Sequence, residues 1–183
     1  MARANKSVLV PFLVFVFLMI NTQPSMSQST QQLIEKICRS TEDYGFCRKT
    51  FDQNLKSPDA DIIAITQITI ERATDNATKT HDFIRQTLDT TKDPALKKAL
   101  TECENAYRVI QGSFASAAVS FFQKDYPSVQ KNEQPTPRLE ASCEATLHAP
   151  PNNLDLLDDR NRQMRILIAM AVTSALQLLG VKA

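Results

Sequence analysis

The residues of this sequence that could carry chemistry are four cysteines, two histidines and a cluster of aspartates. Cys38 and Cys47 stand nine residues apart, and Cys103 and Cys143 stand forty apart. A zinc site would need closely paired cysteines or neighbouring histidines, and a redox site would need a C-x-x-C motif. Neither spacing occurs. An even number of cysteines in a secreted chain instead predicts two disulfides, and three pairings are formally possible.

The histidines and aspartates predict structural roles. His81 lies in the polar stretch "TKTHDF" and is expected in solvent, whereas His148 is expected at the C-terminal end of a helix. Asp155, Asp158 and Asp159 precede an apolar segment, where acids suit a helix N-terminus better than a metal site. No phosphate-binding glycine loop, H-E-x-x-H or G-x-S-x-G motif occurs. The sequence therefore predicts no active site, no metal and no cofactor, and favours binding or inhibition over catalysis.

The first 27 residues have the pattern of a secretory signal peptide. Arg3 and Lys6 precede the apolar run 8–20, which is shorter than the roughly 20 residues that span a bilayer. Cleavage after Ser27 is expected to release residues 28–183 as one domain. The formal net charge then changes from +1 to −1, since the segment holds two basic residues and no acid. A near-neutral chain argues against nucleic acid or a membrane as partner, and the sequon at Asn76 predicts N-glycosylation.

Helical periodicity predicts the helices that would position the cysteines. One apolar stripe steps by four and three residues through Leu96, Leu100, Cys103, Tyr107, Ile110, Phe114, Ala117 and Phe121. Cys143 lies in a second stripe, between Leu139 and Leu147. Two stripe cysteines on neighbouring helices can meet, which favours a Cys103–Cys143 pair. The β-branched run "IIAITQITI" could form a strand, but its seven-residue repeat continues too far for one and predicts a helix.

The resulting architecture is an all-α, up-down-up-down four-helix bundle. Its helices are expected at about 58–90, 94–124, 137–149 and 153–179, preceded by short helical pieces at about 30–40 and 43–56. Ser57, Asp93 and Thr136, each followed by proline, are the expected N-caps of the first three. Residues 125–136 read as a long polar connection. The expected division is residues 28–57 as an extension and 58–180 as the bundle.

Several motifs resemble one known family. "CRSTEDYGFC", "DPALKKALTECENAY", "FFQKDY", "LEASCEATL" and a final apolar helix ending "ALQLLG" are similar to the plant invertase and pectin methylesterase inhibitors. The similarity covers the mature chain and is strongest with a subgroup described as invertase inhibitors, which also includes pollen allergens. It implies an N-terminal α-helical hairpin before the bundle and the disulfides Cys38–Cys47 and Cys103–Cys143. It also implies no catalysis, but one-to-one occlusion of the active-site cleft of a plant enzyme.

The resemblance implies a partner and a compartment. The expected target is plant acid invertase (β-fructofuranosidase), with pectin methylesterase (pectinesterase) as the alternative, in the cell wall or the vacuole. Some invertase inhibitors carry a Pro-Lys-Phe tripeptide before the fourth cysteine, and this sequence has none. Asp125, Tyr126, Pro127 and Lys131 are the expected interface residues. The protein is expected to be a monomer whose affinity depends on pH, because it carries 20 acids in an acidic apoplast. From another class of protein, a secreted helical carrier or receptor ligand is the alternative.

Overall fold

The computed structural model describes residues 28–149 and 156–180, so the expected signal peptide, Asp155 and the last three residues lie outside the described part. The described part is all-helical with two disulfides, which confirms the expected fold class. Its helices are α2 (Gln28–Cys38), α3 (Tyr44–Asn54), α4 (Ile62–Thr90), α5 (Pro94–Phe122), α6 (Tyr126–Glu133), α7 (Thr136–His148) and α8 (Asp158–Leu178).

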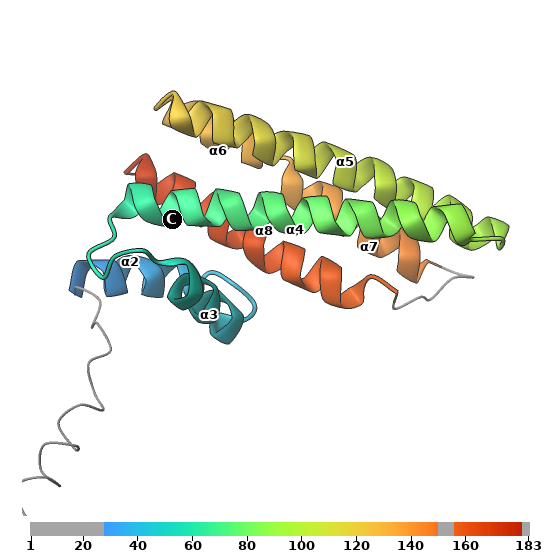
Figure 1. Ribbon diagram of the computed structural model, residues 1–183, viewed down its shortest axis with the longest axis horizontal. Helices are drawn as coiled ribbons and strands as arrows, with labels where there is room; N and C mark the ends of the chain where they lie inside the picture. Colours follow the sequence, from blue (N-terminus) through green and yellow to red (C-terminus); the bar gives the residue numbers. More distant parts are fainter. Residues whose placement is uncertain (1–27, 150–155, 181–183) are drawn as a thin grey trace, which may run out of the picture.

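Four helical arms form the bundle. α4, α5 and α8 run beside one another along the long axis of the molecule (Figure 1), and α4 packs against both α5 and α8. α6 and α7 each pack against α5 and α8, so the two together form the third arm. The α2–α3 hairpin lies beside the end of the bundle where α4 begins and contacts α4 and α8 (Figure 1).

The predicted stripe of α5 forms much of the core. Its eight members are buried, apart from the half-buried Leu96. Asp93 caps the helix as predicted, since its Oδ1 accepts hydrogen bonds from the backbone N–H groups of Ala95 and Leu96 at 2.8 and 2.9 Å. Pro94 occupies the first helical turn, where its missing N–H leaves no gap in the ladder.

The predicted starts of α4 and α8 are wrong, and α8 begins at Asp158 rather than near residue 153. α4 begins four residues later than expected, at Ile62, and its cap is Asp61, whose Oδ1 accepts from the Ala64 N–H at 2.9 Å. Ser57 instead accepts from the Asp59 N–H at 3.2 Å within the segment that links the hairpin to the bundle. Several residues are needed in this segment, because the chain must turn from the α2–α3 hairpin to the bundle before α4 begins.

The segment expected to be a polar connection contains α6. Asp125 caps this helix by accepting from the Ser128 N–H at 3.3 Å. Its buried residues continue those of α7 in steps of four and three, through Val129, Glu133, Thr136, Glu140, Cys143 and Leu147. The third arm breaks at Gln134–Pro135, and Thr136 is not the predicted N-cap, since its hydroxyl donates to the Glu133 carbonyl at 2.7 Å.

Two disulfides and buried polar contacts join the elements. Cys38–Cys47 closes the hairpin, and Cys103–Cys143 joins α5 to α7. Near the second disulfide, the Tyr107 hydroxyl donates to Asn161 Oδ1 at 2.8 Å. Burial raises the pKa of Tyr107, so this hydroxyl keeps its proton and remains a donor.

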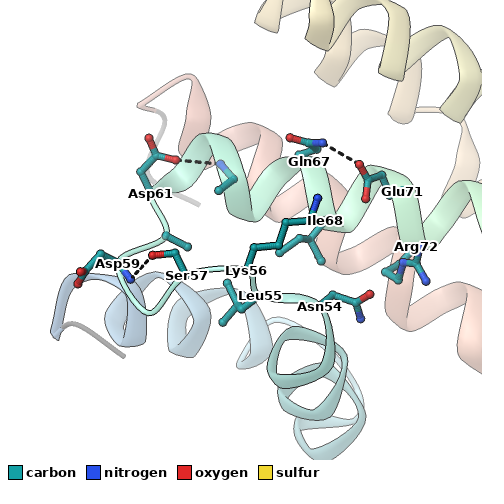
Figure 2. Close-up of a pocket in the computed structure, with 12 residues that line it drawn as sticks. Asn54, Leu55, Lys56, Ser57, Asp59, Asp61, Gln67, Ile68, Glu71 and Arg72 are labelled. Carbon is teal, nitrogen blue, oxygen red and sulfur yellow. Dashed lines mark hydrogen bonds between the residues drawn. The ribbon is translucent and has the colours of Figure 1, made fainter. Parts of the chain in front are cut away.

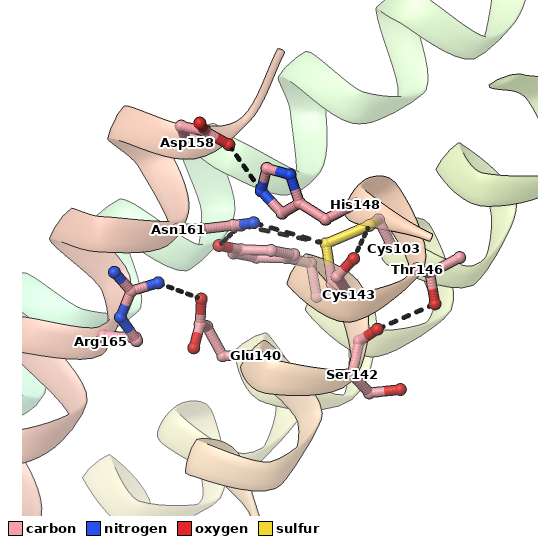
Figure 3. The surroundings of a disulfide bond; sticks show 10 residues. Cys103, Glu140, Ser142, Cys143, Thr146, His148, Asp158, Asn161 and Arg165 are labelled. Carbon is pink, nitrogen blue, oxygen red and sulfur yellow. Dashed lines mark hydrogen bonds and ion pairs between the residues drawn. A yellow bond between two sulfur atoms is a disulfide. The ribbon is translucent and has the colours of Figure 1, made fainter. Parts of the chain in front are cut away.

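Both histidines bridge helices. The expectation that His81 lies in solvent is wrong, because the residue is 8% exposed and its Nε2 lies 2.8 Å from Glu104 Oε1. This contact joins α4 to α5 and gives the buried imidazole a polar partner. His148, at the end of α7, lies 3.1 Å from Asp158 at the start of α8 (Figure 3). Asp158 and Asp159 occupy the first turn of α8, as predicted.

Candidate functional site

The turn between α5 and α6 is closed by two backbone hydrogen bonds. The Lys124 N–H donates to the Phe121 carbonyl at 3.0 Å, and the Asp125 N–H donates to the Ser120 carbonyl at 2.9 Å. These two bonds form a Schellman motif, the C-terminal helix cap in which a left-handed residue usually is glycine. Here that residue is Lys124, with φ of 60°. The turn is therefore held by backbone hydrogen bonds, and the side chains of residues 122–125 are exposed.

Exposed apolar side chains gather at this end of the bundle. Phe122, the last residue of α5, is 72% exposed, and Val119 one turn earlier is 56% exposed. Ile63 is also exposed, in the first turn of α4, which lies at the same end because α4 and α5 are antiparallel neighbours. An exposed aromatic ring beside a turn held by backbone hydrogen bonds is a candidate contact for a protein partner.

The four predicted interface residues divide into two pairs. Asp125 is exposed but acts as the N-cap of α6, and Tyr126 is half-buried, with its ring 6.0 Å from that of Phe121. Pro127 and Lys131 are exposed on α6. The first pair therefore builds the turn, whereas the second is free to contact a partner. We define the bundle-end surface as Ile63, Val119, Phe122, Pro127 and Lys131.

Sequence reasoning missed Phe122. The sequence could have indicated that Phe122 lies outside the core, because Phe121 belongs to the core stripe and the adjacent residue on a helix points about 100° away from it. An aromatic residue outside the stripe must either pack against another element or remain in solvent. It contacts the Phe121 ring edge-on at 6.0 Å, yet most of its surface stays exposed.

Two acids are buried in the third arm. Burial raises the pKa of Glu133 to about 8. For Glu140, burial raises the pKa to about 7, although Arg165 opposes the shift. Arg165 lies 3.4 Å from Glu140, 2.7 Å from Glu144 and 3.2 Å from Glu42 of the α2–α3 loop. One guanidinium thus connects α8, α7 and the hairpin, and Figure 3 shows its contact with Glu140.

A groove of about 530 Å³ lies between the linking segment and α4 (Figure 2). Leu55 and Ile68 contribute apolar surface to it. Many of its polar groups already bond within the chain: Gln67 donates to Glu71 at 2.7 Å, while Asp61 caps α4. We therefore assign the groove to the junction of hairpin and bundle.

The predicted glycosylation site lies within α4. Asn76 is half-buried, and its side-chain nitrogen is 3.4 Å from Gln163 Oε1 on α8. Modification of Asn76 remains a prediction. Across residues 28–149 and 156–180, no group of three or more histidine, cysteine or acidic residues is placed to hold a metal ion. Nor does this described part contain a helix long and apolar enough to cross a membrane.

The geometry defines a class of protein: a disulfide-braced four-helix bundle with an N-terminal helical hairpin. Comparison with known proteins then identifies the family, because the model of the plant invertase/pectin methylesterase inhibitor family matches residues 32–173. The chain belongs to this family and is an enzyme inhibitor rather than an enzyme. This membership sets aside the carrier and receptor-ligand alternatives.

Individual relatives cover most of the chain. It is similar to the cell wall/vacuolar inhibitor of fructosidase 2 of Arabidopsis thaliana, with 30% identity over 69% of this chain and 78% of the relative. The pectinesterase inhibitor of Actinidia deliciosa is 24% identical over 76% of each chain. Among solved structures, a mutant form of a pectin methylesterase inhibitor from Arabidopsis superposes with a TM-score of 0.69 at 18% identity, over 78% of this chain and 94% of that one. This last match supports the fold alone.

Proposed function

We propose that the protein inhibits a plant acid invertase by inserting its bundle-end surface into the active-site cleft, one inhibitor to one enzyme. The observation that carries this proposal is the 72% exposure of Phe122 beside a turn fixed by backbone hydrogen bonds. Invertase is favoured as the target because a relative 30% identical to this chain is named as an inhibitor of fructosidase. We also propose that the protein is a secreted monomer that acts in the cell wall or the vacuole.

The construction of the surface suits inhibition. The Cys103–Cys143 disulfide fixes α7 to α5, and the Schellman turn fixes the start of α6, so the surface needs little ordering on binding. A stable protein–protein complex buries about 1,600 Å² in total, with a few central side chains contributing most of the affinity. Phe122 is suited to be such a central group, and the exposed Pro127 and Lys131 of α6 are further candidate contacts.

Pectin methylesterase is the second candidate. The pectinesterase inhibitor of Actinidia deliciosa covers 76% of this chain, and the absent Pro-Lys-Phe tripeptide removes one feature of some invertase inhibitors. The two candidate functions involve the same fold and the same compartment, so only the identity of the inhibited enzyme distinguishes them.

A parallel titration tests the proposal. The secreted chain, with both disulfides formed, is titrated against acid invertase and pectin methylesterase near pH 5. We expect invertase activity to fall to background at about one equivalent while pectin methylesterase activity is unchanged. Inhibition of pectin methylesterase alone would favour the second candidate, and inhibition of neither enzyme would refute the proposed function.

A further inference from the structure

The core face of the third arm carries two carboxyl groups among apolar and cysteine side chains. Glu133 is 0% exposed, and neither of its carboxyl oxygens has a hydrogen-bond partner within the described part of the chain. The side chain of Glu140, seven residues later on the same face, is 1% exposed. Its Oε1 lies 3.4 Å from Arg165, while its Oε2 is also without a partner there. An ionised carboxylate in such a site is strongly unfavourable.

The surroundings of the two acids differ in charge. Glu140 faces Arg165 of α8, with Glu144 of α7 and Glu42 of the α2–α3 loop also acting on its pKa, and it in turn raises the pKa of Tyr107 on α5. For Glu133, burial is the cause of the raised pKa, and no described charge on α5 or α8, the helices packed against α6, contributes to it. The charged form of Glu133 therefore has no compensating partner.

Glu133 also lies at a point where the backbone hydrogen bonding of the third arm is interrupted. It is the last residue of α6, directly before the break at Gln134–Pro135. Pro135 has no N–H, so the hydrogen-bond ladder is interrupted there. α6 has only eight residues, which is too few for an isolated helix to be stable in water. It stays helical because Val129, Glu133 and Tyr126 pack against the bundle. α7, in contrast, is held by the Cys103–Cys143 disulfide.

We propose that the third arm is a pH-operated latch: with Glu133 uncharged, α6 stays packed on α5 and α8. With Glu133 ionised, the hydrogen bonds of the α5–α6 turn release and α6 opens about the Gln134–Pro135 break, while the disulfide retains α7. Opening would displace Pro127 and Lys131 from the bundle-end surface. The consequence for target binding rests on the proposed function, and the latch itself does not.

The sign of the effect follows from the two protonation states. When α6 is open, Glu133 is in solvent and loses its proton near its ordinary pKa of 4.5; when α6 is packed, it keeps the proton until about pH 8. Between these values the packed state binds more protons, so raising the pH favours opening. The latch is fully closed below about pH 4.5 and weakens as the pH rises to about 8. Glu140 lies on α7, which the disulfide retains, so its burial is the same in both states and it takes no part in the opening.

Hydrogen exchange of the inhibitor alone tests the latch. Wild type and Glu133→Gln are compared at pH 5 and at pH 8, so that the intrinsic pH dependence of exchange cancels between variants at each pH. Gln resembles the uncharged acid but cannot ionise. We expect equal exchange in residues 126–133 at pH 5, and at pH 8 at least about tenfold faster exchange in wild type than in the variant. α7 should exchange at the same rate in both proteins.

Further variants make the test decisive. Glu102→Gln removes an exposed acid of α5 and should leave the exchange of α6 at its wild-type rate. Glu133→Met supplies an apolar side chain of similar size should the amide fail to pack. Equal exchange of α6 in wild type and in a folded Glu133 variant at pH 8 would overturn the latch.

Two assays separate the latch from the proposed function. The exchange experiment contains no enzyme, so a chain that inhibits neither invertase nor pectin methylesterase could still show the latch. If invertase is inhibited, the affinity of wild type should fall between pH 5 and pH 8 more steeply than that of Glu133→Gln. If the affinities of the two proteins for invertase change with pH in the same way, the opening of α6 does not affect target binding.

Discussion

At the scale of single residues, Phe122 has the largest exposed fraction among the large apolar side chains in the described part of the chain. Replacing it by Ala removes an exposed aromatic ring, so the free energy of unfolding should change little, whereas inhibition should weaken by about 10- to 100-fold. Val109→Ala is the matched control, because Val109 is also exposed on α5 but lies outside the bundle-end surface. Inhibition constants for the two variants against the same enzyme check this prediction. Equal constants would remove Phe122 from the interface.

Lys124 allows a second test at this scale. A side chain in the left-handed region is disfavoured by about 1 kcal/mol, and glycine has no such penalty. Lys124→Gly should therefore raise the free energy of unfolding by about 1 kcal/mol in a denaturant titration. Gln123→Gly is the control, since Gln123 has φ of −78° and should gain nothing from glycine. Stabilisation by both changes, or by neither, would contradict this interpretation of the turn.

Glu140 links a residue to the pH dependence of stability. Its pKa is about 7 in the folded chain and about 4.5 in the unfolded chain, so its stabilising effect is complete below pH 4.5 and is lost as the pH rises to 7. The loss is on the order of 3 kcal/mol. Glu140→Gln should flatten the fall in unfolding free energy over this interval. Denaturant titrations at several pH values measure the unfolding free energy of both proteins. The same pH dependence in wild type and variant would contradict this prediction, and would mean that neighbouring groups such as Arg165 stabilise the charged form of Glu140.

At the scale of elements, the two disulfides should contribute unequally. In the chain-entropy description, closing about 10 residues contributes roughly 3 kcal/mol and closing about 41 residues roughly 4 kcal/mol. A Cys38→Ser/Cys47→Ser variant should therefore loosen the hairpin, yet keep the helical signal of the bundle. A Cys103→Ser/Cys143→Ser variant should lose more stability, because it also frees α7 from α5. The midpoints of denaturant unfolding rank the two, and the reverse order would contradict this account.

The third arm shows why pattern reasoning fails for some elements. The stripe of α5 is apolar throughout, and periodicity located it correctly. In the third arm, Glu133, Thr136 and Glu140 occupy core positions, so the stripe is polar in sequence although it is buried in space. Hydrophobic periodicity cannot detect a core face built from glutamate and threonine side chains. The prediction of a polar connection failed for this reason.

At the scale of the whole molecule, the sequence was sufficient to predict the helical bundle and its long helices, and the spacing of the cysteines favoured the Cys103–Cys143 pair that is observed. It was insufficient wherever tertiary packing decides the environment of a polar group. His81 lies in a polar stretch of sequence, yet its Glu104 partner is 23 residues away on the next helix. Phe122 is the opposite case, since this apolar residue remains in solvent because no element of the described part of the chain covers it.

The Cys103–Cys143 disulfide has a last consequence, for the lifetime of the protein. It closes a covalent ring that contains the α5–α6 turn, most of the bundle-end surface and the break in the third arm. If a protease cuts one peptide bond within this ring, the two pieces remain one molecule, and the helices on either side of the cut stay joined at the core. Degradation of the inhibitor in a compartment rich in hydrolases would then require a second cut or reduction of the disulfide.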